Sequence, residues 1–350
     1  MQITRDPMPR DARAHLAAGR VERETQAATA LVVQRTLRAP IGCTGIGLHS
    51  GARISLRLLP GAPDSGIIFR RTDLAGGPVE IPARFDHVVD TRLNTTIGLP
   101  GQPEAVVGTV EHMMAALAGL GVDNAVVELD GAEVPAMDGS AAPFVFLIEC
   151  AGTVAQDAPR QVIEVLRAVR VEEGNGFVAL LPGSGQGISG PGMAIEAEID
   201  FAAAAVRRQS RALRLTPASF KSELAPARTF GFAEEVEALR AAGLARGGSL
   251  KNAIVVSGSR VLNEGGLRFA DEFVRHKMLD QVGDLALAGF ALNARVVGRR
   301  PGHRLNNRVL HALFADASAW RVVPAGMGAA AGVSVRAGAG GLPAAAAAPA

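Results

Sequence analysis

Aromatic side chains are scarce in this chain of 350 residues. Tyrosine is absent, tryptophan occurs once, and 13 phenylalanines supply the rest of the aromatic content. Proteins that bind single-stranded nucleic acid stack bases on aromatic rings, so the composition argues against that class. A one-sided charge is lacking too. The 36 basic and 34 acidic residues give a net charge of +2, which indicates neither a nucleic acid nor an anionic membrane as partner.

Cysteines and long apolar runs are also few. Cys43 and Cys150 have no C-x-x-C partner, so the sequence predicts neither a disulfide framework nor a thiolate zinc site. Both are expected to be buried apolar residues in a reducing compartment. No apolar run reaches the roughly 18 residues that a membrane span needs, and the charged residues 1–30 do not resemble a secretory signal. We therefore expect a soluble, cytoplasmic protein without stable membrane insertion.

Length alone leaves one wide domain, two domains or three open, and the patterning favours two domains of mixed α+β structure. Residues 1–33 mix charges with alanine and are expected to form a mobile extension, and residues 324–350 form an Ala/Gly-rich, low-complexity tail. Between them we place a first α+β domain at 34–158 and a second at 159–323. Both halves run strands, helix, strand, helix, which hints at an internal duplication whose two copies face each other.

Local patterns predict individual elements within these domains. Ile54, Leu56 and Leu58 alternate with polar residues, as in a strand with one buried face. Thr109 is the expected N-cap of a helix that begins near Val110. The first half therefore combines strands with at least one helix.

The stretch from Asn263 to Leu285 carries more ionisable chemistry than a core or surface helix needs. Its apolar residues recur at helical spacing, and His276, Asp280 and Asp284 stand four and eight residues apart, so all three lie on one helix face. An imidazole and a carboxylate one turn apart can share a metal ion. The same spacing is common in solvated His/Asp pairs, so the spacing alone leaves both interpretations open.

A catalytic zinc usually has three protein ligands and an open position for water, so this helix would need one more nitrogen. Of the seven histidines, His112 and His303 are the best candidates. Glu111 precedes His112 at a helix start, where it is either a general base for a water held near that histidine or an ordinary first-turn Glu. His303 lies where a loop enters a helix, and it is either presented to a ligand or simply a surface histidine.

Five segments together resemble a known family. In order and context they are similar to the UDP-3-O-acyl-N-acetylglucosamine deacetylases, the zinc amidases of lipid A biosynthesis; they read TVEHMMAALAGLGVDN, MDGSAAPF, ARTFGF, NEGGLRFADEFVRHKMLDQVGDL and GHRLNN. The resemblance covers roughly residues 34–320. It implies two similar α/β-sandwich halves packed face to face, each with a small insert. The second insert, around residues 233–256, would form an apolar passage for an acyl chain.

The resemblance also implies roles for the candidate residues. Zn²⁺ would be held by His112, His276 and Asp280. Glu111 would act as general base and His303 as general acid. The implied reaction releases acetate from an acylated UDP-sugar, and we expect a monomer.

Other positions would complete the implied site. Asp284 would pair with the general acid, and Thr229 would bind the developing oxyanion. Asp138 would be an outer partner of a liganding histidine. The positions expected to contact substrate are Lys277, Phe230 and Phe232.

Some features depart from the family pattern, and two rival functions exist. Both tails lie outside the resemblance, and Ala-rich residues 202–205 stand where relatives often carry a His-Pro pair. One rival is another zinc amidase, such as a peptidase or a deacetylase of a different sugar, but H-E-x-x-H is absent, which counts against metalloproteases. The other is a binding protein with a structural zinc, which would need a fourth protein ligand.

Overall fold

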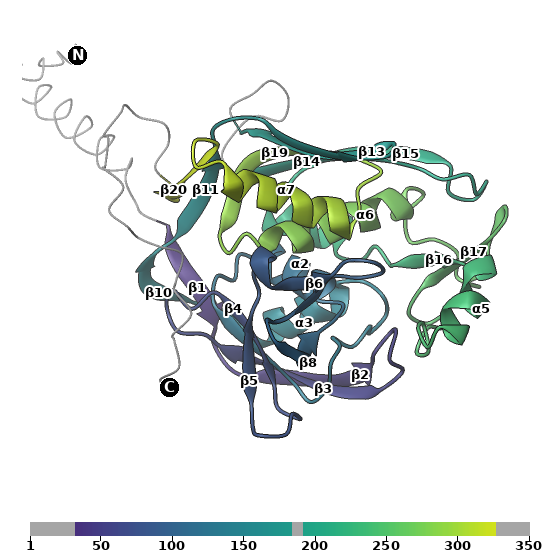
Figure 1. The fold of residues 1–350 in the computed structure, drawn as a ribbon, viewed down its shortest axis with the longest axis horizontal. Coiled ribbons are helices and arrows are strands. Elements are labelled where there is room, and N and C mark those ends of the chain that lie inside the picture. Colours follow the sequence, from purple (N-terminus) through teal and green to yellow (C-terminus); the bar gives the residue numbers. More distant parts are fainter. Residues whose placement is uncertain (1–31, 184–191, 327–350) are drawn as a thin grey trace, which may run out of the picture.

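The computed structural model describes residues 32–183 and 192–326 (Figure 1). It has mixed α+β architecture with several sheets, as the sequence predicted. Apart from a few residues next to the first and last strands, the predicted N-terminal extension and C-terminal tail lie outside the described residues. None of the helices in the described ranges is both long and apolar enough to cross a membrane.

The first half is built on a five-stranded sheet in the order β2-β3-β9-β4-β5. The β4–β9 pair is parallel and the other pairs are antiparallel. Ile54, Leu56 and Leu58 are at most 1% exposed, which confirms the predicted alternation. The strands are β2 (Ile41–Ile46), β3 (Arg53–Pro60), β4 (Ile67–Arg71), β5 (Val79–Pro82) and β9 (Ala125–Leu129).

The second half repeats this arrangement in the order β12-β13-β19-β14-β15. Again the pair at the corresponding place, β14–β19, is parallel and the others are antiparallel. The shared order and sense support the predicted internal duplication. The strands are β12 (Val169–Glu173), β13 (Gly176–Pro182), β14 (Met193–Asp200), β15 (Arg208–Arg214) and β19 (Ala291–Arg299).

Each half carries an insert between its fourth strand and its first long helix. Both inserts contain a three-stranded sheet, and the second adds a helix with no buried residue. The first holds β6 (Val88–Asp90), β7 (Thr96–Leu99) and β8 (Gln102–Val107). The second holds β16 (Phe230–Phe232), α5 (Ala233–Ala241), β17 (Ile254–Ser257) and β18 (Arg260–Val261).

Smaller elements complete the chain. Strands β11 and β20 extend the second sheet beside β19, whereas β1 and β10 form a separate antiparallel pair. β10 ends at Pro159 and β11 begins at Gln161, so we propose that the halves divide within a few residues of the predicted boundary between 158 and 159. The elements are β1 (Val33–Leu37), η1 (Phe85–His87), β10 (Thr153–Pro159), β11 (Gln161–Val165), α4 (Pro217–Ser219), η2 (Phe220–Leu224) and β20 (Trp320–Pro324).

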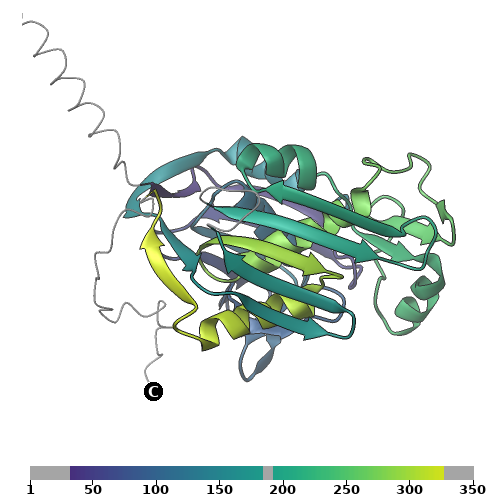
Figure 2. The same ribbon diagram turned by 90° about the horizontal axis from the view of Figure 1, so that it is seen from above.

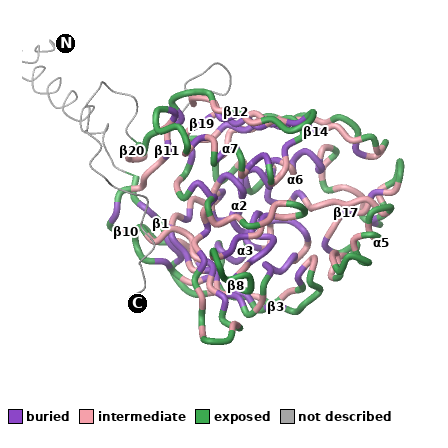
Figure 3. Tube along the Cα trace, viewed as in Figure 1, coloured by how far each residue is buried: buried purple, intermediate pink, exposed green. Residues whose placement is uncertain are grey.

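Four helices fill the space between the two large sheets. They are α2 (Glu111–Gly119), α3 (Ala142–Ala151), α6 (Glu272–Ala286) and α7 (His303–Ala315). Figure 1 shows the layers as sheet, helices, helices, sheet, and Figure 2 shows the second sheet spread over its helices. Buried residues gather along the central helices in Figure 3. The two halves therefore meet helix to helix, with α2 against α6.

Two local predictions were wrong. Neither cysteine is buried as predicted: Cys43 is half-buried, and Cys150 is exposed because it lies on the outer face of α3. Thr109 does not cap α2: the N-cap residue is Val110, which makes no side-chain cap. Thr109 instead has a positive φ of 57° and donates its hydroxyl to Glu133 Oε1 at 3.1 Å. The chain thus turns sharply just before the helix.

Candidate active site

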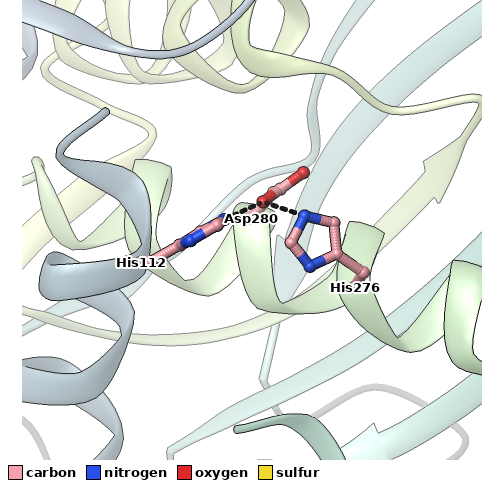
Figure 4. Close-up of side chains that lie close together, drawn as sticks. All are labelled: His112, His276 and Asp280. Carbon is pink, nitrogen blue, oxygen red and sulfur yellow. Dashed lines mark ion pairs between the residues drawn. The ribbon is translucent and has the colours of Figure 1, made fainter. Parts of the chain in front are cut away.

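Three side chains from the two halves meet where α2 and α6 cross. His112 lies in the first turn of α2, and His276 and Asp280 lie on successive turns of α6 (Figure 4). Their possible ligand atoms all lie within 4.8 Å of one another, and all three residues are buried. The structure therefore brings together the trio that the resemblance implied as metal ligands.

The chemistry of this group suits a cation. Asp280 Oδ1 lies 3.5 Å from His112 Nε2 and 3.3 Å from His276 Nε2, yet this buried atom has no hydrogen-bond partner in the described part of the chain. Leaving a buried acceptor unsatisfied costs about 1–3 kcal/mol, and more when it is charged. A metal ion shared with the two imidazoles would remove that cost, and two nitrogens with one carboxylate oxygen form a common zinc ligand set.

The protonation state of His276 fits the same role. Burial lowers the pKa of His276 to about 4, although Asp280 opposes this shift, so the ring is neutral near pH 7. Its contact with Asp280 is therefore not an ion pair. His276 Nδ1 lies 3.1 Å from the Ala227 carbonyl oxygen and donates to it, which leaves the Nε2 lone pair directed toward Asp280.

Glu111 stands beside the metal group on α2. It is 4% exposed, and its Oε2 accepts a hydrogen bond from the Thr95 backbone N–H at 3.0 Å. Burial raises the pKa of Glu111, against the effect of the nearby His303 and His112. A carboxylate whose pKa is raised is a stronger proton acceptor, as a general base requires.

His303 begins α7 and pairs with Asp284 on α6. The distance from His303 Nδ1 to Asp284 Oδ2 is 2.9 Å. Burial disfavours a charged imidazole, but Asp284, together with Glu111 and Asp280, outweighs it and raises the pKa of His303 to about 9. The ring is therefore protonated at neutral pH, the state a general acid needs.

The expected substrate residues lie around this centre. The Phe230 ring is 6.3 Å from the His276 ring, centroid to centroid. Phe232 lies on the same strand as Phe230. Thr229 directly precedes this strand and donates its N–H to the Gly139 carbonyl at 2.8 Å. Lys277 donates to Asp280 Oδ2 at 2.9 Å. It also lines a cavity of about 720 Å³ together with His303, Arg300, Arg304 and residues 89–93.

Comparisons with known proteins bear on this site. A family model for UDP-3-O-acyl N-acetylglycosamine deacetylase matches residues 34–315. Curated UDP-3-O-acyl-N-acetylglucosamine deacetylases from Cellvibrio japonicus, Acidithiobacillus ferrooxidans and Myxococcus xanthus are 48%, 50% and 49% identical to the chain. These alignments cover 83–84% of this chain and 90–94% of the relatives. The chain belongs to the UDP-3-O-acyl-N-acetylglucosamine deacetylase family.

Membership in this deacetylase family extends over the whole candidate site. The matched residues 34–315 include the metal group, Glu111, His303 and the residues around the cavity. They exclude both tails, in agreement with the extent of the resemblance in the sequence.

Asp138 has hydrogen-bond partners that the sequence did not predict. Asp138 accepts from Arg268 Nη2 at 2.9 Å and from the Ser140 hydroxyl at 2.8 Å. Asp138 is held by the Arg268 guanidinium on the loop before α6, and its role as an outer partner of a liganding histidine stays a prediction. The outer partner of His276 is the Ala227 carbonyl.

A buried ion pair holds that backbone oxygen in place. The Glu272 side chain is 0% exposed and accepts from Arg228 Nε at 2.9 Å and from the Arg228 N–H at 3.0 Å. It also accepts from the Arg268 N–H at 2.6 Å. Because Arg228 follows Ala227, this clamp fixes the ARTFGF segment to the start of α6 and so orients His276.

Two further residues of the site were missed in the sequence. Asn306 donates through Nδ2 to Asp284 Oδ2 at 2.8 Å, and Thr95 donates its hydroxyl to Asp284 Oδ1 at 2.5 Å. Asn306 follows His303 by three residues and shares its helix face, a signal that could have revealed it. Thr95 lies in a polar loop without any period, and no sequence signal points to it.

Proposed function

We propose that this protein is a zinc-dependent deacetylase that removes the N-acetyl group of UDP-3-O-acyl-N-acetylglucosamine and releases acetate, a step of lipid A biosynthesis. Family membership supports the substrate and the reaction. The observation that supports the metal is the buried Asp280 Oδ1, which faces two imidazole nitrogens and has no other partner among the described residues. His112, His276 and Asp280 would hold the ion.

A bound zinc ion would supply Lewis-acid chemistry at the amide carbonyl and at the attacking water. Glu111 takes the proton of that water. Its Oε2 is held by the Thr95 N–H, so Oε1 would be the oxygen that accepts the proton. The raised pKa of Glu111, caused by burial, increases its basicity for this step.

His303 completes the proton transfers. Its Nδ1 is bound to Asp284, so its Nε2 proton is the one it gives to the departing sugar amine. The Thr229 hydroxyl would donate to the oxyanion, a contribution worth about 2.7–4 kcal/mol for a well-placed donor. Lys277 would bind the polar part of the substrate, and Phe230 and Phe232 would pack along it.

The rival functions fit the site less well. A structural zinc needs four protein ligands, but the group found within the described residues has three: His112, His276 and Asp280. The acidic Glu111 and the protonated His303 beside them suit hydrolysis. A zinc amidase for peptides or other sugars stays the second candidate, and the substrate test below separates it.

We expect the zinc-loaded protein to release acetate from acylated UDP-N-acetylglucosamine. Chelation should abolish the release, and one equivalent of zinc should restore it, because Asp280 Oδ1 faces two imidazoles and has no hydrogen-bond partner among the described residues. Acetate is measured against UDP-N-acetylglucosamine without the acyl chain, and a series of chain lengths reports the acyl preference. Equal rates on acetylated peptides would favour the rival amidase, and an inert loaded protein would refute the proposal.

Asp284→Asn should move the basic limb of the pH–rate profile to lower pH. A general acid must carry its proton, so the rate falls as pH rises through the pKa of His303. Burial alone would lower this pKa, and the Asp284 charge makes the largest contribution, ahead of Glu111 and Asp280, to raising it to about 9. Loss of that charge should shift the limb down by about 1–3 pH units. A bound cation would lower the pKa of His303 in both the unaltered protein and Asp284→Asn. The quantity to measure is therefore the difference between their basic limbs.

The control for this shift is Asp316→Asn. Asp316 is an exposed residue at the end of α7, and its carboxylate accepts a hydrogen bond from the Ser318 hydroxyl. Its profile should match that of the unaltered protein. His303→Ala should lack the limb altogether. If both limbs persist in His303→Ala, then His303 is not the general acid.

A further inference from the structure

We propose that Thr95 is a positioning residue. It contacts both Glu111, the proton acceptor, and Asp284, the partner of the proton donor His303, and so fixes these two carboxylates relative to each other. The catalytic role of Thr95 rests on the proposed function, but the contacts of Thr95 do not depend on any ligand. Thr95 lies between β6 and β7 in the first insert and is 1% exposed. A polar residue buried so completely must direct its polar groups to internal partners.

All three polar groups of Thr95 are directed at the site. Its N–H donates to Glu111 Oε2 at 3.0 Å, and its carbonyl accepts from the N–H of Val110 at 3.2 Å, at the start of α2. Its hydroxyl donates to Asp284 Oδ1 at 2.5 Å. One residue therefore contacts α2 through its backbone and α6 through its side chain.

The Asp284 carboxylate shows why the hydroxyl matters. Its Oδ2 accepts from His303 and from Asn306, and its Oδ1 accepts from Thr95. The first two donors both come from α7, so Thr95 is the contact that fixes the other oxygen from the opposite half of the chain. With both oxygens held, the carboxylate plane cannot rotate, and the His303 ring that it binds keeps one orientation.

The benefit for hydrolysis is a fixed spacing between the two proton-transfer groups. Glu111 lies on α2, whereas Asp284 on α6 orients His303. Thr95 joins these two carboxylates, because its backbone N–H binds Glu111 and its hydroxyl binds Asp284. Because displacement of a reacting group by about 1 Å can cost about 10²-fold in rate, a shared anchor for both groups should act on the chemical step.

Thr95→Val tests this role, because valine has the same shape and keeps the N–H bond to Glu111 while losing the hydroxyl. We expect kcat to fall about 10- to 100-fold with KM little changed, as for loss of a charged hydrogen bond used in the transition state. Thr95→Ser keeps the hydroxyl and should restore most of the rate. In an Asp284→Ala background, Thr95→Val should have little further effect, since the acceptor is already gone.

Thr36→Val is the matched control for simple destabilisation. Thr36 is also a buried threonine of the first half, and its hydroxyl donates to the Asn124 carbonyl and accepts from the Gly61 N–H, away from the site. This variant should lose thermal stability to a similar extent but keep its kcat. An equal loss of kcat in both variants would overturn the positioning role.

A second measurement does not depend on activity. The His303 Nδ1 proton, identified in NMR spectra by its loss in His303→Ala, should exchange with solvent about tenfold faster in Thr95→Val than in the unaltered protein or in Thr36→Val. Unchanged exchange together with unchanged kcat would refute the proposal for Thr95. If the unaltered zinc protein releases no acetate, the proposed function fails, and the exchange rates still decide whether Thr95 holds Asp284.

Discussion

Glu111→Gln should lower kcat by roughly 10²- to 10⁴-fold while the protein still binds one zinc ion per chain. Glutamine keeps the length of the side chain and can still accept from the Thr95 N–H, so the local geometry is preserved. It cannot take a proton from water. The loss should therefore appear in kcat, whereas KM and metal content stay close to their original values.

Steady-state rates and metal analysis of the same sample check this expectation. The control is Glu104→Gln, which removes an exposed carboxylate on β8. Full activity in Glu111→Gln would rule out the role as base. A loss of zinc would instead show that Glu111 belongs to the metal shell rather than to the proton-transfer step.

Periodic features of the chain could be predicted because they repeat. The alternation around Leu56 identified a strand with one buried face, and helical spacing from Phe273 onward placed His276 and Asp280 on one side of α6. The repeated order of strands and helices likewise indicated the duplication. In these cases burial is decided by neighbours a few residues away, so the sequence itself carries the pattern.

Contacts between distant segments could not be predicted in this way. Thr95 meets Glu111 across 16 residues of the chain and Asp284 across 189. The expected cap at Thr109 failed because a tertiary bond to Glu133 outweighs the local preference for capping. Asp138 took Arg268 as partner for a similar reason. Each outcome depends on how the two halves dock, which no local pattern encodes.

The docking of the halves explains where the site lies. α2 and α6 follow the inserts at corresponding places in the two repeats, and each brings part of the chemistry to the contact between them. α2 supplies Glu111 and His112, and α6 supplies His276, Asp280 and Asp284. Neither half holds three ligands alone, so the separation of these two helices should control metal binding directly.

Gly283→Ala should therefore disrupt both the metal site and the fold. A Cβ atom at Gly283 on α6 would lie 1.9 Å from the Glu111 carbonyl oxygen and 2.7 Å from its carbonyl carbon. These are backbone atoms of α2 and cannot swing aside as a side chain can. The helices must separate, at a cost of about 1–3 kcal/mol or more. The same movement carries His112 away from Asp280.

We expect Gly283→Ala to bind zinc more weakly, to melt at a lower temperature and to lose at least about 10²-fold in kcat, since a shift of about 1 Å is enough for such a loss. Gly119→Ala is the matched control, because its Cβ would meet the Phe220 ring at 2.3 Å, at the other end of α2. That ring can move, so this variant should lose stability but keep its zinc and its KM. If Gly283→Ala retains zinc and full activity, the spacing of α2 and α6 does not control the site.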